Sequence, residues 1–274
     1  MSDGYKANLR PGSDPLVFFG KNDEAGGIAR GHVMAAAISH YLQDGETVFI
    51  GANPLIPIAG ARLAQMTHAP NVNIVAGASG GLNPLLEPLA PSSGDYANLV
   101  AEGVMPFDEV IMLVMGGRAD VFFAGGIQID QRGNCNLVSV GKRDKPILRG
   151  PGSAGVPWGA RAKRTIVYTA AHTKRVFVPE VDFMSLAGWP AEANKNRRGP
   201  VLVITPLAVL DFEDGGNMRL VSTHSGVTLE EVMDNTGFDV VVAEAGVPIT
   251  AHPNTQEMIA MRGFDLDGLL AIVV

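Results

Sequence analysis

An apolar strand runs straight into a glycine-rich loop in Asn73-Ile-Val-Ala-Gly77-Ala78-Ser79-Gly80-Gly81-Leu82-Asn83-Pro84. Small residues let a ligand come close to the backbone N–H groups of such a loop. The loop contains no carboxylate, histidine or cysteine, so the hydroxyl of Ser79 is the only nucleophile that it offers. The chemistry of the protein therefore depends on whether this loop truly lacks a reactive side chain.

Strand and helix patterns alternate on both sides of this loop. Before it, the sequence predicts a helix at 28–42, a strand at 47–50, a helix at 56–66 and a strand at 73–76. After it, the sequence predicts a surface excursion at 83–103, a helix at 107–115, a strand at 119–123 and a loop at 141–164. Further on, it predicts strands at 165–169, 175–178 and 200–205, a hairpin at 209–221 and a helix capped by Thr228. This order is typical of an α/β protein with a mostly parallel sheet.

Length and composition restrict the class of protein. The chain has 274 residues, of which 46% are hydrophobic and 18% charged, so it can bury a sizeable core. No composition shift divides it, and we expect an N-terminal arm at 1–26 and a single domain at 27–274. The net charge of −7 argues against nucleic acid as a partner.

The cysteine content and the apolar runs of the sequence bear on the location of the protein. Cys135 is the sole cysteine, which rules out an internal disulfide and favours a reducing cytoplasm. The N-terminus has no apolar signal region, and the apolar runs are shorter than about 18 residues, so no membrane span is expected.

Four glycine-bearing loops follow predicted strands, at 51–54, 77–81, 125–126 and 150–155. In open α/β sheets ligands bind where strand ends meet loops, so we expect the four to converge on one ligand and to bind it through backbone N–H groups. The alternative is that each glycine serves a tight turn. None of the four matches a dinucleotide-binding or Walker fingerprint.

Other residue types offer alternatives of lower specificity. Gly77-Ala-Ser79-Gly-Gly81 satisfies the bare G-x-S-x-G pattern of serine hydrolases, but Asn83 and Pro84 do not continue the helix that this elbow requires. No histidine pair has metal-ligand spacing, so no metal site is expected, and His172 and His224 are interpreted as loop or cap residues. Two short basic clusters are interpreted as solvated charges or, less favourably, as attraction for the phosphates of coenzyme A; they are 161–164 and 195–198.

Several motifs resemble those of the β subunits of family I coenzyme A transferases, especially the glutaconate CoA-transferase-like ones. The most distinctive is Ala124-Gly-Gly-Ile-Gln-Ile-Asp130 followed by Arg132-Gly-Asn134. The others occur in the family's order: His68-Ala-Pro70, Arg175-Val-Phe-Val-Pro-Glu-Val-Asp182, Pro200-Val-Leu-Val-Ile-Thr205, Ser225-Gly-Val-Thr-Leu-Glu-Glu-Val232 and Asn235-Thr-Gly-Phe-Asp239. The resemblance implies a three-layer α/β/α fold with a mostly parallel sheet, of the CoA-transferase type (NagB/RpiA-like).

The resemblance also implies a substrate and a partner. The substrate is a coenzyme A thioester, no cofactor is permanently bound, and an α subunit completes the enzyme, as an α2β2 assembly. In the true transferases a β-chain glutamate in an E-S-G segment attacks the thioester and then carries CoA as a glutamyl thioester. Ala78 stands in its place here, or Gly77 if the match shifts by one residue.

Relatives with this departure, which open a carbocyclic steroid CoA thioester or decarboxylate methylglutaconyl-CoA, keep the CoA site without the covalent step. We therefore expect an acyl-CoA enzyme of the hydrolase, ring-cleaving or decarboxylase type. Ser79, Gly80 and Gly81 would frame the acyl end, Gly126 and Gln128 the thioester, and Gly152 to Gly155 an anion site, with Asn53 and Asn134 as further polar contacts.

Two alternatives stay open. One is a working transferase, in which Glu87 folds back into the site as the substitute nucleophile. The other is a non-catalytic binding subunit, with all of the chemistry on the α chain.

Overall fold

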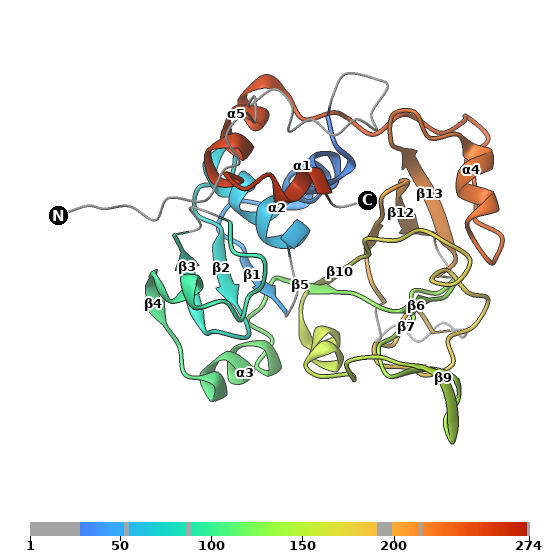
Figure 1. The fold of residues 1–274 in the computed structure, drawn as a ribbon, viewed down its shortest axis with the longest axis horizontal. Coiled ribbons are helices and arrows are strands. Elements are labelled where there is room, and N and C mark those ends of the chain that lie inside the picture. The colour runs from blue at the N-terminus through green and yellow to red at the C-terminus, as the bar shows by residue number, and fades with distance from the viewer. Residues whose placement is uncertain (1–27, 52–54, 86–88, 191–198, 214–215, 273–274) are drawn as a thin grey trace.

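The computed structural model describes residues 28–51, 55–85, 89–190, 199–213 and 216–272. The expected N-terminal arm, Asn53 and Glu87 lie outside these ranges. The main feature of the described part is a nine-stranded mixed sheet with the order β13-β12-β11-β10-β5-β1-β2-β3-β4 (Figure 1). Its strands are β1 (Thr47–Ile50), β2 (Asn73–Ala76), β3 (Gly81–Pro84), β4 (Ala101–Val104), β5 (Val121–Ala124), β10 (Arg164–Tyr168), β11 (Leu202–Ile204), β12 (Ala208–Phe212) and β13 (Met218–Thr223).

The centre of the sheet is parallel and both of its edges are antiparallel. Strands β11, β10, β5, β1 and β2 run in one direction. β12 and β13 extend one side and β3 and β4 the other, each by antiparallel pairing. The expectation of a mostly parallel sheet is confirmed. Because the central strands are parallel, their carboxyl ends all lie along the same side of the sheet.

Helices cover both faces of this sheet. On one face lie α1 (Arg30–Tyr41), α2 (Leu55–Met66), α5 (Thr255–Phe264) and the short η4 (Leu269–Ile272). On the other lie α3 (Phe107–Met115), α4 (Leu229–Asp234) and the short helix η3 (Val156–Arg161). The short helix η2 (Tyr96–Leu99) lies beside β3 and β4. Side chains alternate between the faces, as the two-residue period of a strand requires: Val48 and Ile50 join the first core, and Phe49 the second.

Two small hairpins lie outside the main sheet. β6 (Gln128–Ile129) pairs with β7 (Cys135–Asn136), as predicted for the turn at Arg132-Gly133-Asn134. β8 (Ser139–Lys142) pairs with β9 (Lys145–Arg149) inside what the sequence predicted as a loop. No helix in the described ranges has both the length and the apolar character needed to cross a membrane.

Two further sequence predictions about local structure were wrong. The surface excursion at 83–103 begins and ends in strands, because β3 and β4 add to the sheet edge after the glycine turn. Residues 175–178, rich in valine and phenylalanine, form no strand; Phe177 makes only an isolated bridge to Ile129. Phe177 is fully buried, so tertiary packing and not sheet pairing accounts for its apolar character.

Candidate functional site

A cavity of about 810 Å³ lies at the carboxyl ends of four neighbouring parallel strands, β10, β5, β1 and β2. Each strand is followed directly by residues that line the cavity, and the loop after β9 closes it from another side. These residues are Gly51, Gly77, Ala78, Gly125, Gly126, Thr169, Ala170, Pro151, Gly152, Ala154 and Gly155. The structure thus brings residues of all four glycine loops together around one space, the position where open α/β sheets bind ligands.

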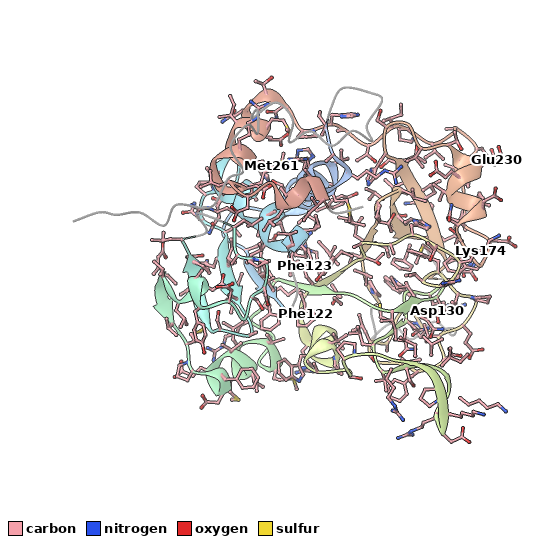
Figure 2. The ribbon with its side chains drawn as sticks, viewed as in Figure 1. Phe122, Phe123, Asp130, Lys174, Glu230 and Met261 are labelled. Atoms are coloured by element: carbon pink, nitrogen blue, oxygen red, sulfur yellow. The ribbon has the colours of Figure 1, made fainter. Side chains whose placement is uncertain are left out.

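Aromatic side chains form part of the cavity walls, beside glycines and short side chains. Phe122 and Phe123, labelled at the centre of Figure 2, come from β5. The ring of Phe122 stacks on Phe49 at 5.0 Å between centroids, and Phe107 lies 6.4 Å from Trp158. Among the lining residues that the structure describes, none is an acid, a base or a cysteine. The polar side chains there are those of Tyr168, whose pKa is raised by burial, and Thr169, which hydrogen-bonds Ala171.

Gly77 and Ala78 both line this cavity, and neither bears a reactive group. The Gly77 N–H donates to Ile50 O at 2.8 Å, and a Cβ at position 77 would come 2.3 Å from the ring of Phe49. Ala78 is exposed on the cavity side. Neither position 77 nor position 78 therefore supplies a carboxylate to the cavity.

Ser79, Gly80 and Gly81 are not among the lining residues. Gly80 has a φ of +83°, and a Cβ there would lie 2.1 Å from Met105 O; one at Gly81 would lie 2.0 Å from Asn98 O. The Ser79 N–H donates to Ser93 O at 3.0 Å. The geometry therefore favours a structural role in the β2–β3 turn over the predicted contact with an acyl group. Since a strand and not a helix follows Ser79, the serine hydrolase alternative loses its structural basis.

Gln128 and Asn134 face inward to the protein. Gln128 Nε2 donates to Asp182 Oδ2 at 2.8 Å, and its Oε1 accepts from Asn136 Nδ2 at 2.6 Å. Asn134 Nδ2 donates to Asp130 Oδ2 at 2.8 Å, and its Oδ1 accepts from the Gly188 N–H at 2.7 Å. These contacts occupy the groups that a substrate would need, so the structure assigns the two residues to the β6–β7 support behind Gly126.

The loop at 152–155 has an unusual backbone on the cavity wall. Gly152 has a φ of +95° and donates its N–H to Leu137 O at 3.0 Å. Ala154 has a φ of +43°, which is uncommon for a residue with a side chain. Within the described ranges, no acceptor is found for the N–H groups of Ala154 and Gly155. Two backbone donors are therefore available beside the cavity, within the predicted anion site.

His172 and His224 lie in loops, and both are buried. His172 hydrogen-bonds Thr205 Oγ1 at 2.8 Å and Thr236 Oγ1 at 3.0 Å, and His224 bonds Thr250 Oγ1 at 2.9 Å and Thr205 O at 2.8 Å. Burial lowers the pKa of each imidazole to about 4, so both are neutral at physiological pH. They cross-link loops, and the sequence pattern could not show this.

The basic cluster at 161–164 makes internal contacts. Lys163 pairs with Asp120 and Arg164 with Glu46, while Arg161 Nε donates to Met115 O. The second cluster, 195–198, lies outside the described residues. No group of three or more histidine, cysteine or acidic residues in the described ranges could hold a metal ion.

Comparison with known proteins adds three findings. A protein-family model described as "Coenzyme A transferase" matches residues 32–235. Two curated relatives are a subunit of the 3-oxoadipate CoA-transferase of Pseudomonas knackmussii (33% identity, covering 85% of this chain and 92% of the relative) and the cholesterol ring-cleaving hydrolase IpdB subunit of Rhodococcus jostii (32%, 86% and 91%). The solved structure of the decarboxylase AibA/AibB superposes with a TM-score of 0.80 at 26% identity, covering 90% of this chain and 98% of that one.

Proposed function

The chain belongs to the coenzyme A transferase family, and we propose that it acts on an acyl-CoA thioester without carrying CoA covalently on a glutamate of its own. It is the β subunit of an enzyme of that family. The proposed reaction is hydrolytic, ring-cleaving or decarboxylating rather than a transfer between two carboxylates. The reactions named for IpdB and for AibA/AibB show that this fold hosts such chemistry.

One observation carries the proposal: the lining of the cavity that the structure describes contains no carboxylate, and Gly77 and Ala78 line it. Covalent CoA transfer uses a carboxylate because its attack on the acyl-CoA gives an acyl anhydride. The released CoA can then attack this anhydride and become bound to the enzyme as a thioester. A glutamate at 77 would have to displace the ring of Phe49. Positions 77 and 78, which we propose correspond to the glutamate of the transferases, therefore carry no carboxylate, and position 77 has no space for a side chain.

The remaining groups suit stabilisation of negative charge. We propose that the N–H groups of Ala154 and Gly155 face the thioester oxygen, where charge develops when the carbonyl is attacked or becomes an enolate. The aromatic walls reduce water around that charge and so strengthen its interaction with the backbone dipoles. The chain then binds and polarises the thioester, and a proton-transfer group is needed from elsewhere.

We propose that the partner α subunit supplies this group, by way of an exposed apolar surface. This surface, which we call the α3 face, surrounds the outer strand β4 and consists of Tyr96, Leu99, Val100, Val104, Phe107, Met112 and Met115. Exposed apolar patches of this kind mark interfaces. Phe107 belongs both to this face and to the cavity wall, so a subunit docked on the face would reach the cavity. AibA/AibB is a structure of two different chains.

The finer points of the assembly rest on the family resemblance. An α2β2 heterotetramer that serves catabolism is the arrangement we propose. A cytoplasmic location accords with Cys135, a single buried free thiol whose pKa is raised by burial.

The experiment compares reactions with and without a CoA acceptor. The chain is purified together with its α subunit and given 3-oxoadipyl-CoA, glutaconyl-CoA and alicyclic acyl-CoA thioesters, with or without succinate or acetate. Loss of the thioester, ring opening or release of CO₂ without any acceptor is expected. Turnover that strictly requires the acceptor would establish a working transferase, the second candidate, which the 33% identical 3-oxoadipate CoA-transferase relative favours.

A matched pair of variants separates catalysis from scaffolding. Met112→Glu places a charge on the α3 face and is expected to prevent co-purification of the α subunit. Ile147→Glu, at a similarly exposed apolar position on β9, is the control and should leave assembly intact. If Ala78→Phe leaves turnover and CoA affinity unchanged in the assembled enzyme, this chain is a non-catalytic subunit.

A further inference from the structure

The β8–β9 hairpin carries a concentration of positive charge that contrasts with the rest of the chain. It projects from the body at the lower right of Figure 1. Residues 142–149 include four cations, Lys142, Arg143, Lys145 and Arg149, against the single carboxylate of Asp144, whereas the whole chain has a net charge of −7. All five side chains are exposed. Such a local excess of one sign attracts ligands of the other sign.

The pairing within the hairpin works against its own stability. The register places Lys142 directly opposite Lys145, and like charges at directly opposite positions of an antiparallel pair repel. No ion pair with any of the four cations is found in the described part of the chain. This differs from Lys163 and Arg164, which are both neutralised by acids. The hairpin therefore presents cations that no acid in the described part of the chain neutralises.

The base of the hairpin is part of the cavity wall. Leu137, just before β8, and Pro151 and Gly152, just after β9, all line the cavity. The Gly141 N–H donates to Asp182 Oδ2 at 2.9 Å, the same carboxylate oxygen that accepts from Gln128. The β6–β7 support thus fixes the direction in which the hairpin leaves the cavity.

We propose that the β8–β9 hairpin binds the phosphates of the 3′-phospho-ADP portion of the acyl-CoA, an inference that rests on the proposed function. From Arg149 to Lys145 the strand rises by about 13 Å, at about 3.3 Å per residue. A thioester held in the cavity has its phosphates at the far end of the long pantetheine arm. The hairpin runs from the cavity outward and presents its cations along that path.

Neighbouring apolar side chains fit the base of the same nucleotide. Ile147 is 87% exposed and Leu148 51% exposed, beside the cations of the same strand. Adenine has a flat apolar face, and the phosphates are negatively charged. The hairpin surface has both apolar side chains and cations, so it matches a nucleotide better than a simple anion.

The test measures binding of CoA, dephospho-CoA and pantetheine to the enzyme purified with its α subunit. Calorimetry is carried out at low and at physiological salt. Lys142→Ala/Lys145→Ala should weaken CoA binding by about tenfold, reduce the salt dependence, and leave pantetheine binding unchanged. Lys174→Ala/Arg175→Ala, which removes the same charge from exposed positions, is the matched control and should bind CoA as the unmodified enzyme does. Figure 2 shows Lys174 well away from the hairpin.

The outcomes separate the two proposals. If the hairpin variant binds CoA as tightly as the control, the hairpin inference is overturned while the proposed function stands. If neither CoA nor pantetheine binds to the unmodified enzyme, the proposed function fails as well. A melting temperature of the hairpin variant equal to or above that of the control shows that the two lysines serve binding and not folding.

Discussion

The cavity and the β6–β7 hairpin behind it use polar chemistry in opposite ways. The hairpin is dense in polar side chains, and those of Gln128, Asp130 and Asn134 are consumed by contacts within the protein. The cavity is lined by aromatic rings, glycines and short side chains. In this protein the polar side chains of the sequence motif therefore do not indicate where the ligand binds. The glycines at the strand ends do indicate it.

This difference follows from burial. A buried polar group has to be hydrogen-bonded, so the polar residues of the sequence motif specify a structure rather than a contact. A backbone N–H needs no side chain to act as a donor, and a cavity wall made of glycine can come close to a ligand. The two regions predict opposite responses to mutation: lost stability in the first and lost activity in the second.

The largest effect is expected for Gln128→Leu. It removes three hydrogen bonds at once, those of Gln128 with Asn136 Nδ2, the Asp182 N–H and Asp182 Oδ2, which should lower the free energy of unfolding by about 3 kcal/mol. Urea titration measures this loss. Gln131→Leu, which removes one exposed hydrogen bond to Asp239 O, is the control and should cost less than about 1 kcal/mol. A changed KM in the folded fraction of Gln128→Leu would restore Gln128 as a substrate contact.

A second effect concerns acid and the buried imidazoles. The pKa of His172 is lowered to about 4, below the ordinary value of 6.5, so the unfolded chain binds the proton more readily. The stability that the protein gains from keeping His172 neutral is therefore fully present above about pH 6.5 and is lost as the pH falls towards 4. Between pH 7 and 5, His172 should account for about 2 kcal/mol of lost unfolding free energy.

Denaturation at the two pH values measures it. His172→Gln should be less stable at pH 7 but should lose about 2 kcal/mol less on acidification. His224 and His32, whose pKa values burial also lowers to about 4, remain as the background. An equal loss in the variant and the unmodified protein would mean that His172 is already charged in the fold.

Much of the fold could be predicted from the sequence, because the spacing of its apolar residues was clear. Strands at 47–50 and 73–76 and the helix at 107–115 were predicted with their observed bounds. The β3–β4 edge of the sheet was missed because Gly81–Pro84 has no β-favouring pattern, and pairing with β2 and β4 overrides it. The opposite edge, β12 and β13, is the hairpin that was predicted at 209–221.

At the site, convergence of the glycine loops was predictable from the position of strand ends. The aromatic walls were not, since Phe107 and Trp158 come from separate helices that only tertiary packing unites. Phe49 and Phe122 could be taken equally well for ordinary core residues. The internal hydrogen bonds of Gln128 and Asn134 were not predictable either, because a motif does not show the direction in which its side chains face.

Neighbouring positions 77 and 78 give the third test, since both line the cavity but differ in free space. Gly77→Ala would bring a methyl group 2.3 Å from the Phe49 ring, and the repacking should cost about 1–3 kcal/mol. Ala78→Leu points into open space and should change stability by less than about 0.5 kcal/mol, while lowering kcat/KM at least tenfold. Thermal melting and steady-state assays of the two variants together check the contrast. Equal stability losses would show that the cavity is closed at both positions.

The smallest change in stability is expected for the β8–β9 hairpin. Lys145→Glu converts a repulsive cross-strand pair with Lys142 into an attractive one and should raise the free energy of unfolding by about 0.2–1 kcal/mol. Ile147→Ala, which leaves the charges unchanged, serves as the reference, and urea titration of both variants measures the difference. A loss of stability in Lys145→Glu would mean that Lys145 has a partner that stabilises the fold.

The central claim is that no side chain of this polypeptide forms a covalent bond to the substrate. The most direct measurement is to incubate the enzyme, complete with its α subunit, with acyl-CoA, treat it with borohydride and map the peptides by mass spectrometry. Borohydride reduces a glutamyl thioester to an alcohol, which marks the residue. We expect every glutamate of this chain to be recovered unmodified; a reduced glutamate here, above all Glu87, would contradict the account.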